Sequence, residues 1–203
     1  SGYRLQAKLL TLMACIKSIY DFNAETLDGQ TIPLSIYRGK VLLIVNLVVF
    51  SFYSSVRQYH RLNALMEMFG HLNFTVLGFS CNQFGLQANH ETLNILKYVR
   101  PGGGFVPKFP VFGKIEVNGL NEEPLFTYLK ESLPYVNPVI GDIKKFYWSP
   151  IKVNDLRWNF EKFLIASDGE PYRRYELHGP IENVEKDIAG LVDGGICSFL
   201  GCQ

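Results

Sequence analysis

Apolar residues along the chain form short runs that alternate with amphipathic segments. The run from Val41 to Phe50 is almost entirely apolar and rich in valine and leucine, which is typical of a strand buried on both faces of a mostly parallel sheet. After it, apolar residues recur every three or four positions and stop at Gly70, as in an amphipathic helix that ends at a glycine. A second buried strand, Phe74 to Phe79, and a second helix, Glu91 to Val99, repeat this pattern.

The pattern as a whole predicts an α/β fold, with a central mixed sheet flanked by helices on both faces and an N-terminal hairpin in front of it. In such sheets, sites lie beyond the carboxyl ends of the parallel strands. The loop after Phe50 is therefore the first place to look for chemistry. The remaining expected elements are a hairpin from Ser18 to Leu34 around Asp28-Gly29, a strand from Phe109 to Val117, a helix from Pro124 to Leu133, a hairpin of Phe160 to Ala166 with Pro171 to Tyr175, and a final helix carrying Ile181, Val184, Ile188 and Leu191.

Length and charge favour a single soluble domain. The 203 residues are 47% hydrophobic and 19% charged, which suits one compact core. We expect an N-terminal extension over residues 1–17, the domain over 18–193 and a cysteine-bearing tail over 194–203. Lysine and arginine number 20 against 19 aspartates and glutamates, so the overall charge gives no reason to expect nucleic acid or a membrane as a partner. No apolar run approaches the roughly 20 residues of a membrane-spanning helix.

The four cysteines are Cys15, Cys81, Cys197 and Cys202. None has the spacing of a zinc site, so we expect no metal and no cofactor. Cys15, Cys197 and Cys202 lie near the chain ends, where disulfides could hold mobile segments; the alternative is that they are free thiols of a cytoplasmic protein. The tripeptide that begins at Asn73 is a glycosylation acceptor. Together these features favour a secreted protein.

Four segments carry a resemblance to a known family. They are Gly39 to Asn46, Leu77 to Gly85, Lys97 to Phe105 and Arg157 to Leu164. In this order they resemble the glutathione peroxidase family, and the likeness runs from about Ile19 to Leu191. The resemblance implies a thioredoxin-like fold and a selenocysteine or cysteine, after the first central strand, that attacks a hydroperoxide.

The resemblance also implies a set of residues around that nucleophile, here Gln83, Trp158 and Asn159. Amide and indole N–H groups stabilise a thiolate or selenolate without bringing a competing positive charge. The alternative is that the three side chains now only satisfy one another's hydrogen bonds. At the position of the nucleophile this chain departs from the family.

Counting forward from Asn46, the nucleophile falls on Ser51; counting back from Arg57, it falls nearer Phe52. A serine hydroxyl offers neither the accessible anion nor the sulfur or selenium chemistry that takes oxygen from a peroxide. A substitution of selenocysteine made for expression would explain Ser51, but the glycine that should follow is also replaced, by Phe52 or Tyr53. Natural loss of the nucleophile is the better interpretation.

Cys81 is the only candidate substitute for the lost nucleophile. In the resembling proteins the same cysteine stands beside the glutamine without being the nucleophile, so we expect a buried, inert thiol. The favoured hypothesis is a secreted family member without peroxidase activity that serves as an oligomerising or ligand-binding protein. The alternative is an oxidoreductase that reduces hydroperoxides with glutathione through Cys81.

Two further groups of residues concern binding and assembly. In glutathione-using members, matching arginines hold the acidic tripeptide, because guanidinium groups pair bidentately with carboxylates; the alternative for each is a solvated surface position or an internal salt bridge. A loop with three consecutive glycines is typical of members that form tetramers, so we expect a homo-oligomer, either a dimer or a tetramer. The arginines are Arg57, Arg100, Arg173 and Arg174, and the loop residues are Pro101, Gly102, Gly103, Gly104 and Phe105.

Overall fold

The central element of the fold is a five-stranded sheet with the order β5-β4-β3-β6-β7. The computed structural model describes residues 18–48, 53–84, 92–99, 101–134 and 139–199, with the backbone alone for residues 53–55, 92, 145 and 194–199. Strands β3, β4 and β5 are parallel, whereas β6 and β7 run antiparallel to their neighbours. The expected mixed sheet is therefore confirmed. The strands are β3 (Val41–Leu47), β4 (Phe74–Cys81), β5 (Val111–Ile115), β6 (Lys162–Ile165) and β7 (Pro171–Tyr175).

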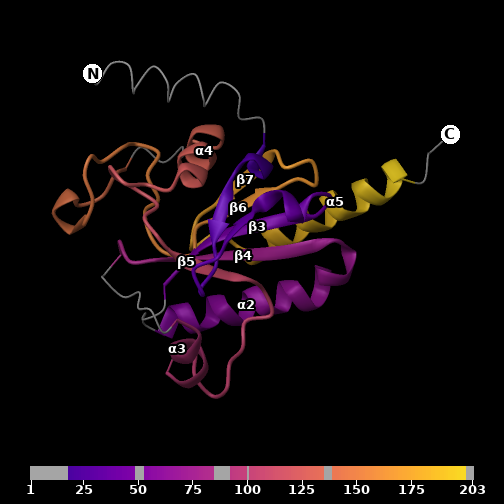
Figure 1. The fold of residues 1–203 in the computed structure, drawn as a ribbon, viewed down its shortest axis with the longest axis horizontal. Helices are drawn as coiled ribbons and strands as arrows, with labels where there is room; N and C mark the ends of the chain where they lie inside the picture. Colours follow the sequence, from indigo (N-terminus) through magenta and orange to yellow (C-terminus); the bar gives the residue numbers. More distant parts are fainter. Residues whose placement is uncertain (1–17, 49–52, 85–91, 100, 135–138, 200–203) are drawn as a thin grey trace.

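Helices cover both faces of the sheet, and α2 and α4 lie on opposite sides of it (Figure 1). One core cluster joins the sheet to α2, α3 and α5, and a second joins it to α4 and the N-terminal segments. Every residue of β3 and β4 is buried, because these strands have a helical layer on each face. The helices are α2 (Tyr53–Phe69), α3 (Thr92–Tyr98), α4 (Pro124–Ser132) and α5 (Ile181–Phe199), with 3-10 turns at Ile19–Asp21, Leu34–Tyr37, Gly70–Leu72 and Ile143–Lys145.

The predicted N-terminal hairpin is present as an antiparallel pair, β1 (Asn23–Glu25) and β2 (Thr31–Pro33). Its turn contains Gly29 with a φ of 82°, a conformation that glycine adopts without a steric penalty. The hairpin forms its own two-stranded sheet; it packs against the main sheet through Ala24, and among the described residues one isolated β-bridge, between Thr26 and Phe112, links the two.

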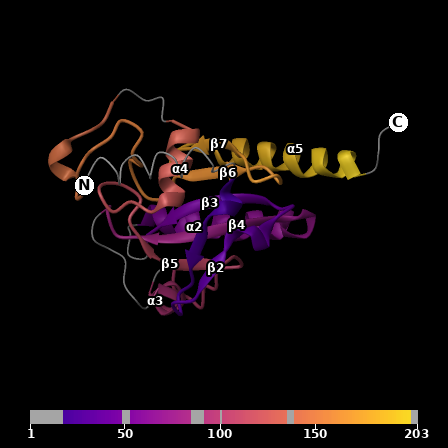
Figure 2. The ribbon, with the colours of Figure 1, turned by 45° about the horizontal axis from the view of Figure 1, so that its top comes forward.

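Two boundaries differ from the prediction. β5 is shorter than the expected Phe109 to Val117, because the backbone at Val117 bonds to a side chain instead of to a neighbouring strand. α5 continues to Phe199, so the expected boundary at residue 193 falls inside a helix, and the division into a domain and a tail stays a prediction. No proline interrupts the chain from Glu182 to Phe199, so nothing of that kind ends the helix earlier. Figure 2 shows α5 extending well past the edge of the sheet.

Among the described residues, no helix combines the length and apolarity that a membrane crossing needs.

Candidate functional site

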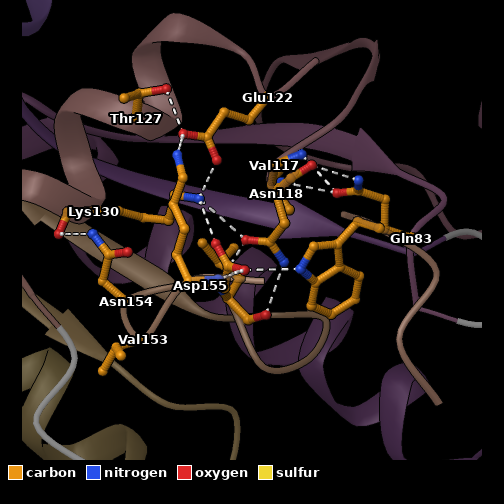
Figure 3. A network of polar contacts seen from close by, with 12 residues as sticks. Gln83, Val117, Asn118, Glu122, Thr127, Lys130, Val153, Asn154 and Asp155 are labelled. Carbon is orange, nitrogen blue, oxygen red and sulfur yellow. Dashed lines mark hydrogen bonds and ion pairs between the residues drawn. The ribbon is translucent and has the colours of Figure 1, made fainter. Parts of the chain in front are cut away.

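Gln83 lies just beyond the carboxyl end of β4, where the topology predicts a site. Its Oε1 accepts hydrogen bonds from the backbone N–H groups of Val117 and Asn118, each at 2.9 Å, and its Nε2 donates to the carbonyl oxygen of Asn118 at 2.7 Å (Figure 3). The side chain is buried. Gln83 therefore joins the end of β4 to the turn that follows β5.

Trp158 and Asn159 lie on a turn that leads into β6, beside the carboxyl end of β3. Asn46 of β3 holds this turn twice: its Nδ2 donates to the carbonyl oxygen of Trp158 at 3.1 Å, and its own carbonyl oxygen accepts the N–H of Phe160 at 2.8 Å. Phe160 has a φ of 62°, which is uncommon for a residue with a bulky side chain. Trp158 is 50% exposed and Asn159 is buried.

The structure brings Gln83 and Trp158 to the same cavity, which has a volume of about 310 Å³. Asn159 is not among its lining residues, and Ser51 lies outside the described residues. The described contacts do not show hydrogen bonds among the side chains of Gln83, Trp158 and Asn159. Gln83 bonds to backbone groups, and Asn159 Oδ1 has no hydrogen-bond partner among the described residues. The lining consists of Gln83, Phe84, Val139, Ile140, Gly141, Asp142, Phe146, Trp148, Arg157 and Trp158.

A buried polar network supports both parts of this site. The Nζ of Lys130 on α4 lies 2.6 Å from Glu122 Oε2 and 3.1 Å from Asp155 Oδ1, and it donates to Asn118 Oδ1 at 3.2 Å (Figure 3). The Asn118 side chain also exchanges two hydrogen bonds with the backbone of Leu156, each at 2.9 Å. Since Asn118 holds Gln83 and Leu156 precedes the Trp158 turn, the network fixes the two segments relative to each other.

Charge balance keeps this network stable in the interior. Burial alone would raise the pKa of Glu122, but hydrogen bonds from Lys130 and Lys152 and the charge of Lys130 outweigh it and lower that pKa. Trp148 Nε1 donates to the second oxygen of Asp155 at 2.8 Å. The sequence analysis missed this network. Its signal is that Lys130 falls on the apolar face of α4, one residue after the buried Leu129.

Cys81, the candidate substitute nucleophile, faces the core at the end of β4. It is fully buried, and burial raises the pKa of its thiol to about 11. Its Sγ lies 4.0 Å from Gln83 Oε1. Such a thiol is almost entirely protonated near neutral pH, which agrees with the expectation of an inert cysteine.

Three of the four expected arginines lie among the described residues. Arg57 is exposed on α2, and Arg100 lies outside the described residues. Arg173 pairs with Asp187 at 2.6 Å and Arg174 pairs with Glu161 at 2.7 Å. For these two, the structure shows the alternative of internal salt bridges. Arg174 is also buried, and it donates to the carbonyl oxygens of Asn154 and Asp155.

The glycine loop after α3 is ordered by contacts within the chain. The N–H groups of Gly102 and Gly104 donate to carbonyl oxygens at the end of α3, at 3.0 and 2.9 Å. Phe105, expected at a subunit interface, is instead buried against Tyr59 with a ring-centroid distance of 5.8 Å. Phe105 therefore contributes to the core of this chain, where burial of a large aromatic side chain is favourable, and the expected subunit interface at the loop stays a prediction. Pro101, Gly103 and Gly104 keep some exposure.

Other predicted sites are only partly described. Cys15 and Cys202 lie outside the described residues, and for Cys197 the structure gives only its place in α5. Asn73 is exposed in a left-handed conformation at the end of a 3-10 turn. Among the described residues, no group of three or more histidine, cysteine, aspartate or glutamate side chains is arranged to hold a metal ion.

Comparison with known proteins identifies the fold and then the family. The solved structure of T. cruzi GPX1 matches with a TM-score of 0.63 and 30% identity, covering 87% of this chain and 97% of that one. The fold and the position of the cavity beyond the parallel strands define a thioredoxin-like α/β protein.

Sequence relatives make the assignment specific. The chain is 47% identical over 183 residues to glutathione peroxidase 2 of Homo sapiens, covering 87% of this chain and 95% of the relative. It is 46% identical over 175 residues to glutathione peroxidase 3 of Hylobates lar, with coverage of 84% and 76%. The family model for glutathione peroxidase matches residues 19–130. The chain belongs to the glutathione peroxidase family.

Proposed function

We propose that this protein is a glutathione peroxidase homologue that has lost hydroperoxide reduction and acts as a secreted oligomerising or ligand-binding protein. The observation that carries the proposal is the state of Cys81. It is the cysteine nearest to Gln83 among the described residues, and it is buried with a pKa raised to about 11. With serine or phenylalanine at the expected nucleophile position, no described thiol near Gln83 forms a reactive anion near neutral pH.

The chemistry of the reaction explains why the remaining residues are not sufficient. Peroxide reduction begins when a thiolate or selenolate attacks one peroxide oxygen, forms an S–O or Se–O bond and breaks the O–O bond. Gln83, Trp158 and Asn159 can stabilise such an anion but cannot supply it. Their retention is therefore compatible with an inactive protein.

The cavity supports a binding role. Gln83 and Trp158 both line it, and half of the Trp158 surface is exposed. Among the four expected arginines, Arg57, which is exposed on α2, is the strongest described candidate for a small anionic ligand such as glutathione. Arg173 and Arg174 are weaker candidates, since a ligand would have to compete with Asp187 and Glu161.

The test is hydroperoxide reduction with glutathione in a coupled assay, run on the unmodified protein, on Cys81→Ser and on Ser51→Cys. We expect the first two to be indistinguishable from the uncatalysed background. Ser51→Cys should recover little activity, because the bulky residues after position 51 would misplace the thiol, and errors near 1 Å can cost around a hundredfold in rate. Activity of the unmodified protein that Cys81→Ser abolishes would favour the oxidoreductase alternative.

A further inference from the structure

Lys162, the first residue of β6, is a buried amine whose position is unusual. Its side chain is 2% exposed, and its Nζ donates to the carbonyl oxygen of Phe160 at 2.7 Å. Among the described residues it forms no ion pair with a carboxylate. Lysine is rarely buried without a counterion, since removing an ammonium group from water is costly. The hydrogen bond to the Phe160 carbonyl oxygen is therefore the contact to consider as the role of this amine.

What it contacts is the turn that carries Trp158 and Asn159. Phe160 holds a left-handed backbone conformation, with a φ of 62°, which is unfavourable for such a residue and persists only where neighbours impose it. The neighbours are Asn46, which binds the turn on the β3 side, and Lys162, which binds the Phe160 carbonyl oxygen. Hydrogen bonds thus hold the turn on both sides of Asn159.

We infer that Lys162 is a positioning residue of this site: its Nζ holds the Phe160 carbonyl oxygen and thereby sets where Trp158 and Asn159 lie. The inference does not depend on whether the protein reduces hydroperoxides. It adds to the residues expected from the family an amine that lies behind the turn, on the side facing α2. A residue that only filled the core would be apolar at this position, as Leu164 is on the same face of β6.

The charges around Lys162 give the inference a second readout. The pKa of Lys162 is lowered to about 8, first by burial and then by the charge of Arg61 on α2, while the charge of Glu161 partly opposes both. Glu161 is itself paired with Arg174 of β7. In the sheet, Lys162 pairs with the apolar Val45 of β3 and with Tyr175 of β7, whose hydroxyl donates to Asp187 of α5. Lys162 therefore changes charge within the pH range where the protein can be studied, and the strength of its hydrogen bond to Phe160 changes with it.

The experiment uses the protein labelled with 5-fluorotryptophan, which gives two fluorine resonances, for Trp148 and Trp158, assigned through Trp158→Phe. Lys162→Met keeps the length of the side chain and removes the donor. We expect it to shift the Trp158 resonance by more than its linewidth and to leave the Trp148 resonance unchanged. Lys162→Arg restores a donor and should return the Trp158 resonance toward its original position at pH 7.

The pH profile and the stability distinguish positioning from simple core packing. The Trp158 resonance of the unmodified protein should show a step with a midpoint near pH 8, absent in both variants. Because the folded-state pKa of Lys162 lies below its ordinary value of 10.5, its protonation favours the unfolded chain at neutral pH. Lys162→Met should therefore melt no lower than the unmodified protein at pH 7. A Trp158 resonance that Lys162→Met does not move, or that moves only together with a loss of the melting transition, would overturn the inference.

Discussion

Removing the ammonium group of Lys130 should destabilise the protein far more than removing any surface lysine. Lys130 is 1% exposed and lies 2.6 Å from Glu122 and 3.1 Å from Asp155. Lys130→Met would leave the fully buried Asp155 without a cation, although Trp148 and the backbone N–H of Lys152 would still donate to it. Breaking a buried ion pair from one side costs about 3–5 kcal/mol. Because these donors remain, we expect the loss of unfolding free energy in Lys130→Met to lie near the lower end of this range.

The assay is urea unfolding at pH 7, followed by circular dichroism, with Lys108→Met as the matched control. Lys108 pairs with Glu67 at the surface, where the two side chains are 54% and 59% exposed, and such pairs contribute at most about 1 kcal/mol. A loss of about 3 kcal/mol should also lower the melting temperature by roughly 6–12 °C in a domain of this size. Equal losses for the two variants would refute the reasoning.

Acid should reduce the difference between Lys130→Met and the unmodified protein. The folded-state pKa of Glu122 is lowered below its ordinary value of 4.5, so the stability it contributes is present above that value and is lost as the pH falls through the folded-state pKa. In Lys130→Met most of this contribution is already absent. A difference that stays constant down to pH 3 would show that the charge of Glu122 is not involved.

Four further predictions follow from single features. Gly78→Ala should destabilise by about 1–3 kcal/mol through overpacking, because the added Cβ would lie 2.4 Å from Leu47 Cδ1, whereas Gly190→Ala on α5 has open space and should not destabilise; thermal melts compare the two. Cys81 should react with a thiol reagent only after denaturation, since its pKa is raised to about 11. Thiol counting in denaturant without reductant should find one or two of the four cysteines free; four would argue against disulfides at Cys15, Cys197 and Cys202. Native mass measurement should give a dimer or tetramer, and a monomer at micromolar concentration would contradict the proposed assembly.

The central part of the fold could be predicted because burial on both faces leaves a strong pattern. β3 and β4 read as continuous apolar runs, and the structure confirms both. Element ends were less certain, because they depend on contacts with distant segments. The end of β5 depends on Gln83, because its Oε1 accepts the N–H of Val117, which is then not available to a neighbouring strand.

The site was predicted in its residue types but not in its connections. The sequence places Gln83 and Trp158 near the carboxyl ends of strands, and they do line one cavity. Helical spacing places Lys130 on an apolar face, but it cannot say that Glu122 and Asp155 meet it there. The internal pairing of Arg174 with Glu161 was equally invisible, since the two residues come together only through the pairing of β6 with β7.

The hydrogen bonds of Gln83 affect how inactive members of an enzyme family can be recognised from sequence. Its three described side-chain hydrogen bonds to backbone groups all go to the turn after β5, so replacing it would leave buried backbone groups without partners. Selection for folding alone would then keep this glutamine even in a family member without peroxidase activity. A surviving motif of this kind records an architecture, and it cannot by itself be used to date or to diagnose the loss of an activity.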